Sequence, residues 1–170
     1  GETQSVFKQE GKKEKPEDED SEEDRDSQAI ENKAWKIAEL GDEVVEDQSL
    51  RIIFKEAEGE EPITPKNPDN RIITLQGEFY LDAYEDIEFT LKGLDLMDDQ
   101  NNVYTPVQTN VLEKEKWNNI KLLKGGHVIL QVSFEVPKDA TPLYMRRATS
   151  GKPRPYLLID LKGMGEEATE

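Results

Sequence analysis

The chain has 170 residues, no cysteine, one histidine and a formal net charge of −16 at pH 7. A surface this acidic repels the phosphates of nucleic acids and of anionic lipids, so neither is an expected partner. The missing cysteines exclude disulfides, thiolate metal sites and cysteine nucleophiles, and no apolar run approaches the roughly 20 residues of a membrane helix.

The first 32 residues predict a disordered acidic linker. They contain 12 acidic and 5 basic residues, and Val6 and Phe7 are the only large apolar side chains before Ile30. Such a segment cannot bury enough apolar surface to offset the entropy that ordering would cost. We expect a solvated tether, and the alternative is an acidic segment that docks on a basic partner. Residues 164–170 predict a second, short disordered tail.

Between these tails, residues 33–163 predict one folded domain made of strands. The stretch around Trp35 and Ile37 fits a short helix or a strand, and we favour a strand or irregular entry. Alternation of apolar and polar residues then predicts three strands, whose inward residues are Leu50, Ile52 and Phe54; Ile73, Leu75, Gly77 and Phe79; and Ile87, Phe89 and Leu91. Prolines predict a loop over 58–70, and Asp and Asn residues predict a hairpin turn over 97–104.

The last third of the chain contains the clearest strand. Residues 102–126 are ambiguous, and their middle fits either a short helix around 112–120 or an irregular crossover. After two glycines, inward residues alternate with polar ones: Val128, Leu130, Val132 and Phe134. Residues 137–154 predict a connection in which 143–147 could form a short edge strand, and 155–163 closes the domain. About seven strands separated by turns predict an all-β, immunoglobulin-like antiparallel β-sandwich.

Three segments of this predicted sandwich are similar to one known family. They are "LGDEVVEDQSLRIIFKEAE", "FTLKGLDLMDDQNNVYTP" and "LLKGGHVILQVSFEVPKDA". In this order they resemble the telokin-like, immunoglobulin-like domain of unknown function found in lipoproteins of Gram-positive bacteria, which is related in fold to an immunoprotective extracellular protein. The positions that match the family's turn and strand motifs are Phe89, Leu91, Asp98, Asn102, Tyr104, Gly126, Phe134, Val136 and Pro137.

The resemblance covers residues 35–162, with two departures. The family has a single acidic residue before the turn where this chain has the longer "DLMDDQ", and residues 141–155 form a bulky insertion before the last strand. The family brings no catalytic residue. It implies an exported protein on the outer face of the cytoplasmic membrane of a Gram-positive bacterium, held by a lipid-modified cysteine upstream of Gly1.

One basic island interrupts the acidic chain near its end. It consists of Arg146, Arg147, Lys152 and Arg154, with Tyr144 beside them. Arginine forks bind carboxylates and other anions through paired hydrogen bonds, so these residues are candidates for contact with an anionic partner. Two alternatives remain: the charges pair locally with the acidic surface, or they bind the acidic tail.

Metal and catalytic sites have little support in the sequence. Asp98 and Asp99, close to Asn101 and Asn102, could bind calcium, but their spacing does not match a calcium loop and fits turn formers better. His127 stands alone at a strand start, so it cannot build a multi-histidine metal site, and we expect it to be solvated. No nucleotide-binding, esterase or zinc-protease motif occurs, so we expect no cofactor.

The favoured function is a non-enzymatic binding module tethered at the cell surface. The loops over 58–70 and 141–155 would contact a protein or cell-wall partner, and we expect a monomer. A hydrolase that uses acidic residues is one alternative, although with 38 acidic residues suggestive pairs arise by chance. An intracellular scaffold domain with an acidic docking tail is the other.

Overall fold

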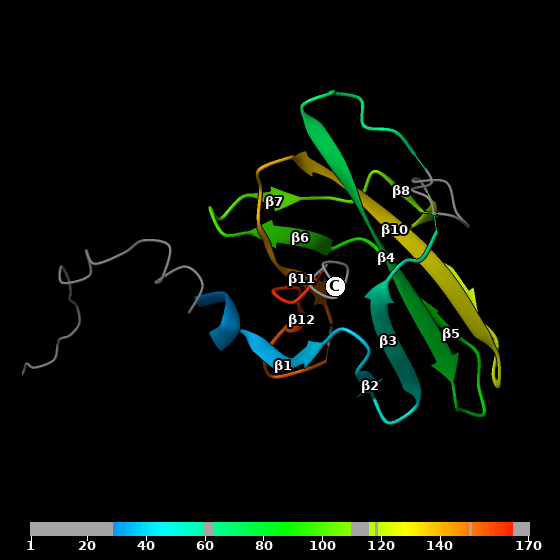
Figure 1. The fold of residues 1–170 in the computed structure, drawn as a ribbon. Helices are drawn as coiled ribbons and strands as arrows, with labels where there is room; N and C mark the ends of the chain where they lie inside the picture. The colour runs from blue at the N-terminus through cyan, green and yellow to red at the C-terminus, as the bar shows by residue number, and fades with distance from the viewer. Residues whose placement is uncertain (1–28, 60–62, 110–115, 118, 150, 165–170) are drawn as a thin grey trace, which may run out of the picture.

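The strands of the described chain form two packed sheets, which face each other in Figure 1. Buried and exposed side chains alternate along these strands. The computed structural model describes residues 29–59, 63–109, 116–117, 119–149 and 151–164. In spatial order, the first sheet contains β1 (Ala34–Glu39), β12 (Tyr156–Asp160), β11 (Pro142–Ala148), β6 (Leu94–Asp98) and β7 (Val103–Tyr104). The second contains β2 (Glu43–Glu46), β3 (Leu50–Glu56), β4 (Asn70–Leu81), β10 (His127–Pro137) and β8 (Gln108–Thr109).

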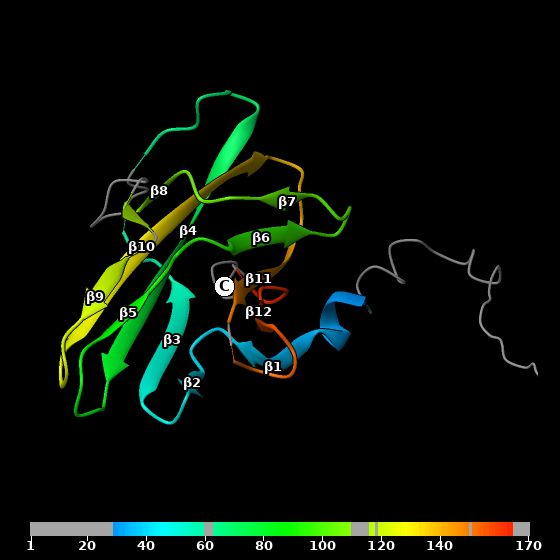
Figure 2. The ribbon, with the colours of Figure 1, turned by 180° about the vertical axis from the view of Figure 1, so that it is seen from behind.

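A separate pair, β5 (Ile87–Phe89) with β9 (Ile120–Leu122), lies beside the second sheet, as the view from behind in Figure 2 shows. The predicted all-β, immunoglobulin-like sandwich is confirmed as the fold class. The described residues form more strands than the seven expected, because β2, β5, β7, β8 and β9 are short pieces of two to four residues. The strands pair antiparallel except for β1 and β12, which run parallel.

The inward side chains that the alternation predicts fill the space between the sheets. Leu130, Val132 and Phe134 of β10 are at most 1% exposed, while Val128 near the strand start is half-buried. β10 pairs with β4 from His127 to Pro137 and with β8 on its other side. The clearest predicted strand is therefore an interior strand of the second sheet.

The segment Pro142–Ala148 corrects the prediction of a connection or a short edge strand. β11 lies inside the first sheet, between β12 and β6. Its Met145 and Arg147 face the space between the sheets, and Tyr144 on the outer face is buried as well. Burial of both faces places apolar and polar residues on each side, so the alternation that marks an interior strand is weak here.

A single helical turn over 29–32 covers part of the outer face of the first sheet. The sequence assigns these residues to the acidic linker, whose residues 1–28 lie outside the described chain. Buried side chains under the turn form a small cluster apart from the main core: Ile30, Ala34, Tyr144 and Leu158. This cover buries the outer face of β12 at Leu158, while Leu157 and Ile159 on its inner face pack in the main core.

Two further predictions concern the turns and the ambiguous middle segment. The predicted hairpin is β6 followed by β7, with Asn101 in the left-handed region at φ 66°. Residues 110–115 and 118, on which the helix alternative rests, lie outside the described chain, and Ile120 begins β9 instead. Within the described residues, no helix is long and apolar enough to cross a bilayer.

Candidate functional site

The structure does not bring the five candidate contact residues together on one surface. Arg147 points into the sandwich and is 6% exposed, as is Glu46. The Arg147 Nε and Nη2 atoms donate to the two carboxylate oxygens of Glu46 over 3.1 and 3.2 Å, and Nη1 donates to the Thr90 carbonyl over 3.1 Å. Because Glu46 lies on β2 and Arg147 on β11, this buried ion pair joins the two sheets.

Arg146 and Tyr144 lie on the outer face of the first sheet. The Arg146 Nη2 atom is 3.1 Å from an Asp95 carboxylate oxygen, and the guanidinium lies over the Tyr156 ring at 5.1 Å from its centroid. The buried Tyr144 hydroxyl donates to Glu31 in the helical turn. These contacts fix both side chains against neighbours of the same chain.

Lys152 and Arg154 belong to the loop that follows β11. The Lys152 Nζ atom is 3.7 Å from an Asp47 carboxylate oxygen and 4.4 Å from the centroid of the Trp35 ring. The Arg154 Nη1 atom donates to the Ala34 carbonyl over 3.5 Å. Each cation of the island therefore has a partner among the described residues, and contact of the island with an external anion stays a prediction.

Asp98 closes the β6–β7 hairpin. Its Oδ1 accepts hydrogen bonds from the backbone N–H groups of Gln100 and Asn102, and its Oδ2 accepts from the Asn102 side chain and from the Tyr104 hydroxyl. Burial opposes ionisation, but these hydrogen bonds outweigh it and lower the pKa of Asp98. A calcium site near Asp98 and Asp99 stays a prediction; among the described residues, no group of three acidic or histidine side chains could hold a metal ion.

His127 is exposed at the start of β10, on the outer face of the second sheet. Its ring stacks on Tyr80 of β4 with centroids 5.5 Å apart, and Arg51 of β3 lies 4.9 Å from the same tyrosine centroid. In the next row, Glu78 accepts hydrogen bonds from its neighbours and forms an ion pair with Lys55 over 2.9 Å. This face is an ordered polar surface.

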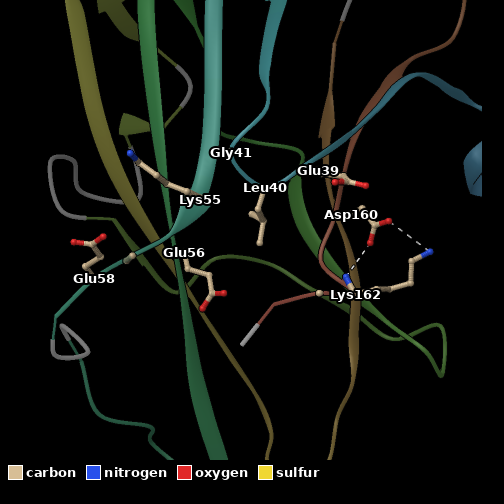
Figure 3. Close-up of a pocket in the computed structure, with 10 residues that line it drawn as sticks. Glu39, Leu40, Gly41, Lys55, Glu56, Glu58, Asp160 and Lys162 are labelled. Carbon is tan, nitrogen blue, oxygen red and sulfur yellow. Dashed lines mark hydrogen bonds and ion pairs between the residues drawn. The ribbon is translucent and has the colours of Figure 1, made fainter. Parts of the chain in front are cut away.

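A cleft of about 650 Å³ lies on the side of the sandwich where β1 leads into β2. Figure 3 shows Glu56 and Glu58, from the end of β3, on one side of it and Asp160 and Lys162, from the end of β12, on the other. Leu40 lies between them. The cleft is lined by Glu39, Leu40, Gly41, Lys55, Glu56, Ala57, Glu58, Asp160, Lys162 and Gly163.

The crossing from the first sheet to the second sets the shape of this cleft. Gly41 has φ 90°, a conformation that glycine adopts without steric cost, and its N–H donates to the Phe54 carbonyl over 2.7 Å. The Glu39 N–H donates to the Asp42 carboxylate over 2.9 Å. Leu40 packs against the main core. The backbone hydrogen bonds and this apolar contact hold the floor of the cleft in place.

Both lysines of the lining are held by neighbouring groups. The hydrogen bond from Lys55 to Glu78 raises the pKa of Lys55. The Lys162 Nζ atom donates to the Tyr144 hydroxyl over 3.3 Å and lies 3.7 Å from Asp160, and the bond to Tyr144 raises the pKa of Lys162. The other charged groups of the lining are carboxylates: Glu39, Glu56 and Glu58. The cleft therefore favours ligands that carry positive charge.

Among the residues that the structure describes, the carboxylates with clearly lowered pKa values are Glu78, Asp98 and Glu135. Each accepts hydrogen bonds that favour its ionised form. A general acid at neutral pH needs the opposite shift, because it must hold its proton until the reaction uses it. None of the three carboxylates lines the cleft, so their pKa shifts come from hydrogen bonds elsewhere in the fold.

Sequence reasoning missed most residues of this cleft. Glu58 lies at the start of the predicted 58–70 binding loop, and it is the one lining residue inside either predicted binding loop. Glu39 and Asp160 belong to strands whose positions relative to each other follow from the parallel pairing of β1 with β12. No local pattern signals that pairing, because the paired residues are far apart in the chain: Ala38 and its partner Ile159 are 121 positions apart.

No protein-family model and no curated protein sequence matches this chain. Several solved structures are similar to it, and three of them are described below. The secreted protein MPT63 from Mycobacterium tuberculosis is 10% identical, with a TM-score of 0.53, and the match covers 73% of this chain and 95% of that one. The YjhA protein from Bacillus subtilis is 15% identical, with a TM-score of 0.50, and the match covers 72% and 98%.

The third structure is an uncharacterized β-sandwich protein from Clostridium difficile. It is 10% identical, with a TM-score of 0.48, and the match covers 75% of this chain and 94% of that one. At these identities, the likeness to MPT63 and YjhA shows a shared β-sandwich fold. This likeness in fold gives no evidence for a ligand, an activity or a membrane anchor in this chain.

Proposed function

We propose that this chain is a non-enzymatic binding module that works outside the cell and contacts a protein or cell-wall partner bearing cationic groups. The observation that carries this proposal is the acidic cleft between the ends of β3 and β12. Its walls are strand ends and its floor is a hydrogen-bonded turn, so the carboxylates are presented by a rigid support. A preformed concave site with a few convergent charges is the usual form of a binding site.

The extracellular setting rests on separate support. One solved structure of the same fold is a secreted protein, and three sequence segments resemble a lipoprotein domain. In the proposed arrangement, a lipid anchor upstream of Gly1 holds the chain on the outer face of the cytoplasmic membrane. The acidic segment over 1–28, which the sequence predicts to be a disordered linker, would then extend the sandwich away from the anionic lipid surface, because like charges repel.

The binding role is tested by capture with charge-reversed variants. The immobilised full chain is incubated with native membrane and cell-wall extracts, and bound material is compared between the wild type and Glu39→Lys/Glu58→Lys. A matched control is Glu85→Lys/Asp139→Lys, which makes the same charge change at exposed positions outside the cleft lining and outside both predicted binding loops. We expect loss of capture only in the cleft variant. Equal capture by all three proteins would overturn the assignment of the cleft.

The tether is tested by fractionating cells that express the whole natural gene. We expect the protein in the membrane fraction and, in intact cells, accessible to added protease. Recovery in the soluble cytoplasmic fraction would contradict the proposed location and leave the cleft experiment unaffected.

A further inference from the structure

The acidic cleft of Figure 3 has two charged walls, which come from different sheets. Glu39 of β1 and Asp160 of β12 are paired neighbours in the first sheet and form one wall. Glu56 ends β3 of the second sheet, Glu58 follows two residues later, and both belong to the other wall. A ligand that uses both walls must therefore cross the cleft.

The two lysines of the lining leave the middle of the cleft open. The Lys55 ammonium pairs over 2.9 Å with Glu78, which lies outside the lining. The Lys162 ammonium lies 3.7 Å from the Asp160 carboxylate. In Figure 3 both lysine side chains point away from Leu40, which lies between the walls. The cationic groups already present therefore do not occupy the place of a ligand.

Each wall presents one exposed carboxylate to a ligand. Glu39 and Glu58 are both exposed. Asp160 is held within its own turn, because its Oδ1 accepts from the Lys162 backbone N–H over 2.8 Å and its Oδ2 pairs with the ammonium of the same residue. The charge of Glu58 also acts on Lys55, but the hydrogen bond of that lysine goes outside the lining. One cationic side chain can thus bind at each wall.

An apolar floor separates the two carboxylates. Leu40 and Ala57 line the cleft and are half-buried. Leu40 is fixed in place because it packs against the main core. The Ala57 N–H donates to the Thr74 carbonyl over 3.2 Å, which holds the second wall against β4. Covering this floor with an apolar group removes further apolar surface from water, which favours binding.

On the basis of the binding role proposed above, we infer that the cleft takes an extended peptide segment in which two basic side chains flank an apolar one. The basic side chains reach Glu39 and Glu58, and the apolar side chain packs on Leu40. Alternate side chains of an extended segment point the same way, so the three groups stand at its first, third and fifth positions. At roughly 3.3 Å per residue these positions span about 13 Å. The cleft volume of about 650 Å³ suits a short segment of this kind.

The experiment is an NMR titration of the ¹⁵N-labelled full chain with three capped peptides. They are Lys-Ser-Leu-Ser-Lys, its glycine version Lys-Ser-Gly-Ser-Lys and its acidic version Glu-Ser-Leu-Ser-Glu. We expect the first to shift the backbone amides of Leu40, Gly41 and Gly163 with a Kd in the millimolar range. The glycine version should bind several-fold more weakly, because it leaves the floor uncovered, and the acidic version should not bind.

Single variants test the two walls separately. Glu39→Gln and Glu58→Gln each remove one exposed charge, so each should weaken binding of the leucine peptide roughly two- to five-fold, the effect of an exposed ion pair. Glu85→Gln makes the same change at an exposed position outside the lining and should leave the Kd unchanged. Unshifted amides elsewhere in the spectrum check that each variant keeps the fold.

The possible failures separate this inference from the proposed function. Equal binding of the leucine and glycine peptides would overturn the apolar contact, and a wild-type Kd for either wall variant would overturn the two-wall arrangement. Both results leave a cleft that binds cations. If neither lysine peptide shifts the cleft amides, or if the acidic peptide shifts them equally, the inference and the role of the cleft in the proposed function fail together.

Discussion

Replacing Glu46 by alanine should destabilise the sandwich more than any single change on its surface. The side chains of Glu46 and Arg147 are 7% and 8% exposed, and the carboxylate accepts two charge-assisted hydrogen bonds. Without Glu46, the guanidinium stays buried between two sheets with its charge unpaired. Removing one partner of such a pair typically costs about 3–5 kcal/mol.

That loss is large compared with the stability of a whole domain, which is roughly 5–15 kcal/mol. For a chain of this size, each kcal/mol lowers Tm by roughly 2–4 °C, so Glu46→Ala should lower it by about 6–20 °C. The assay is urea unfolding followed by the fluorescence of Trp35 and Trp117, with a thermal scan beside it. Glu46→Leu combined with Arg147→Met is the control, because it removes both charges and should recover most of the stability.

A loss below about 1 kcal/mol for Glu46→Ala would refute this reasoning, because surface ion pairs contribute no more than that. A double variant as unstable as the single one would also count against it. In that case the pair would supply hydrogen bonds and shape that no apolar packing replaces, and the cost would not come from an unpaired buried charge.

Three further predictions concern the core and the β6–β7 hairpin. Gly77→Ala would place a Cβ 2.7 Å from a ring carbon of the buried Phe54, so it should cost about 1–3 kcal/mol in urea unfolding, and adding Phe54→Leu should restore part of the loss. The pKa of Asp98 is lowered in the fold, so ionised Asp98 stabilises the fold above its ordinary pKa of 3.8, and this stabilisation is lost as the pH falls through the folded-state value. Asp98→Asn should therefore be less stable than the wild type at pH 7. In acid unfolding, the stabilities of the two proteins should converge. Burial and the bond to Asp98 raise the pKa of Tyr104 from 10.0 to about 12, so stability should fall as the pH rises through that interval, and an ultraviolet titration of Tyr104→Phe should lack the tyrosine that ionises last.

The sequence predicted those parts of the fold in which one face of a strand is buried and the other is solvated. Leu50, Ile52 and Phe54 keep strict alternation because the outer face of β3 carries Arg51 and Lys55. β11 was misjudged because its outer face is covered by residues 29–32, which bury Tyr144. A strand buried on both faces loses the period of two that marks it.

The candidate sites were harder to predict for a related reason. Arg147 was identified as a basic residue of a loop, although its position two residues after Met145 places it on the inward face of the same strand. Its partner Glu46 lies 101 positions away, and no local pattern signals a contact at that range. The cleft depends on the parallel pairing of β1 with β12, which is likewise set by the tertiary fold.

The most direct test of the binding role is crosslinking on intact cells. A photo-reactive amino acid is introduced at Glu39 in the acidic cleft or at Glu85 outside its lining, in the chain expressed at its natural level. The account predicts a discrete adduct from position 39 and none from position 85. Adducts of equal yield from both positions, or none from position 39, would contradict it.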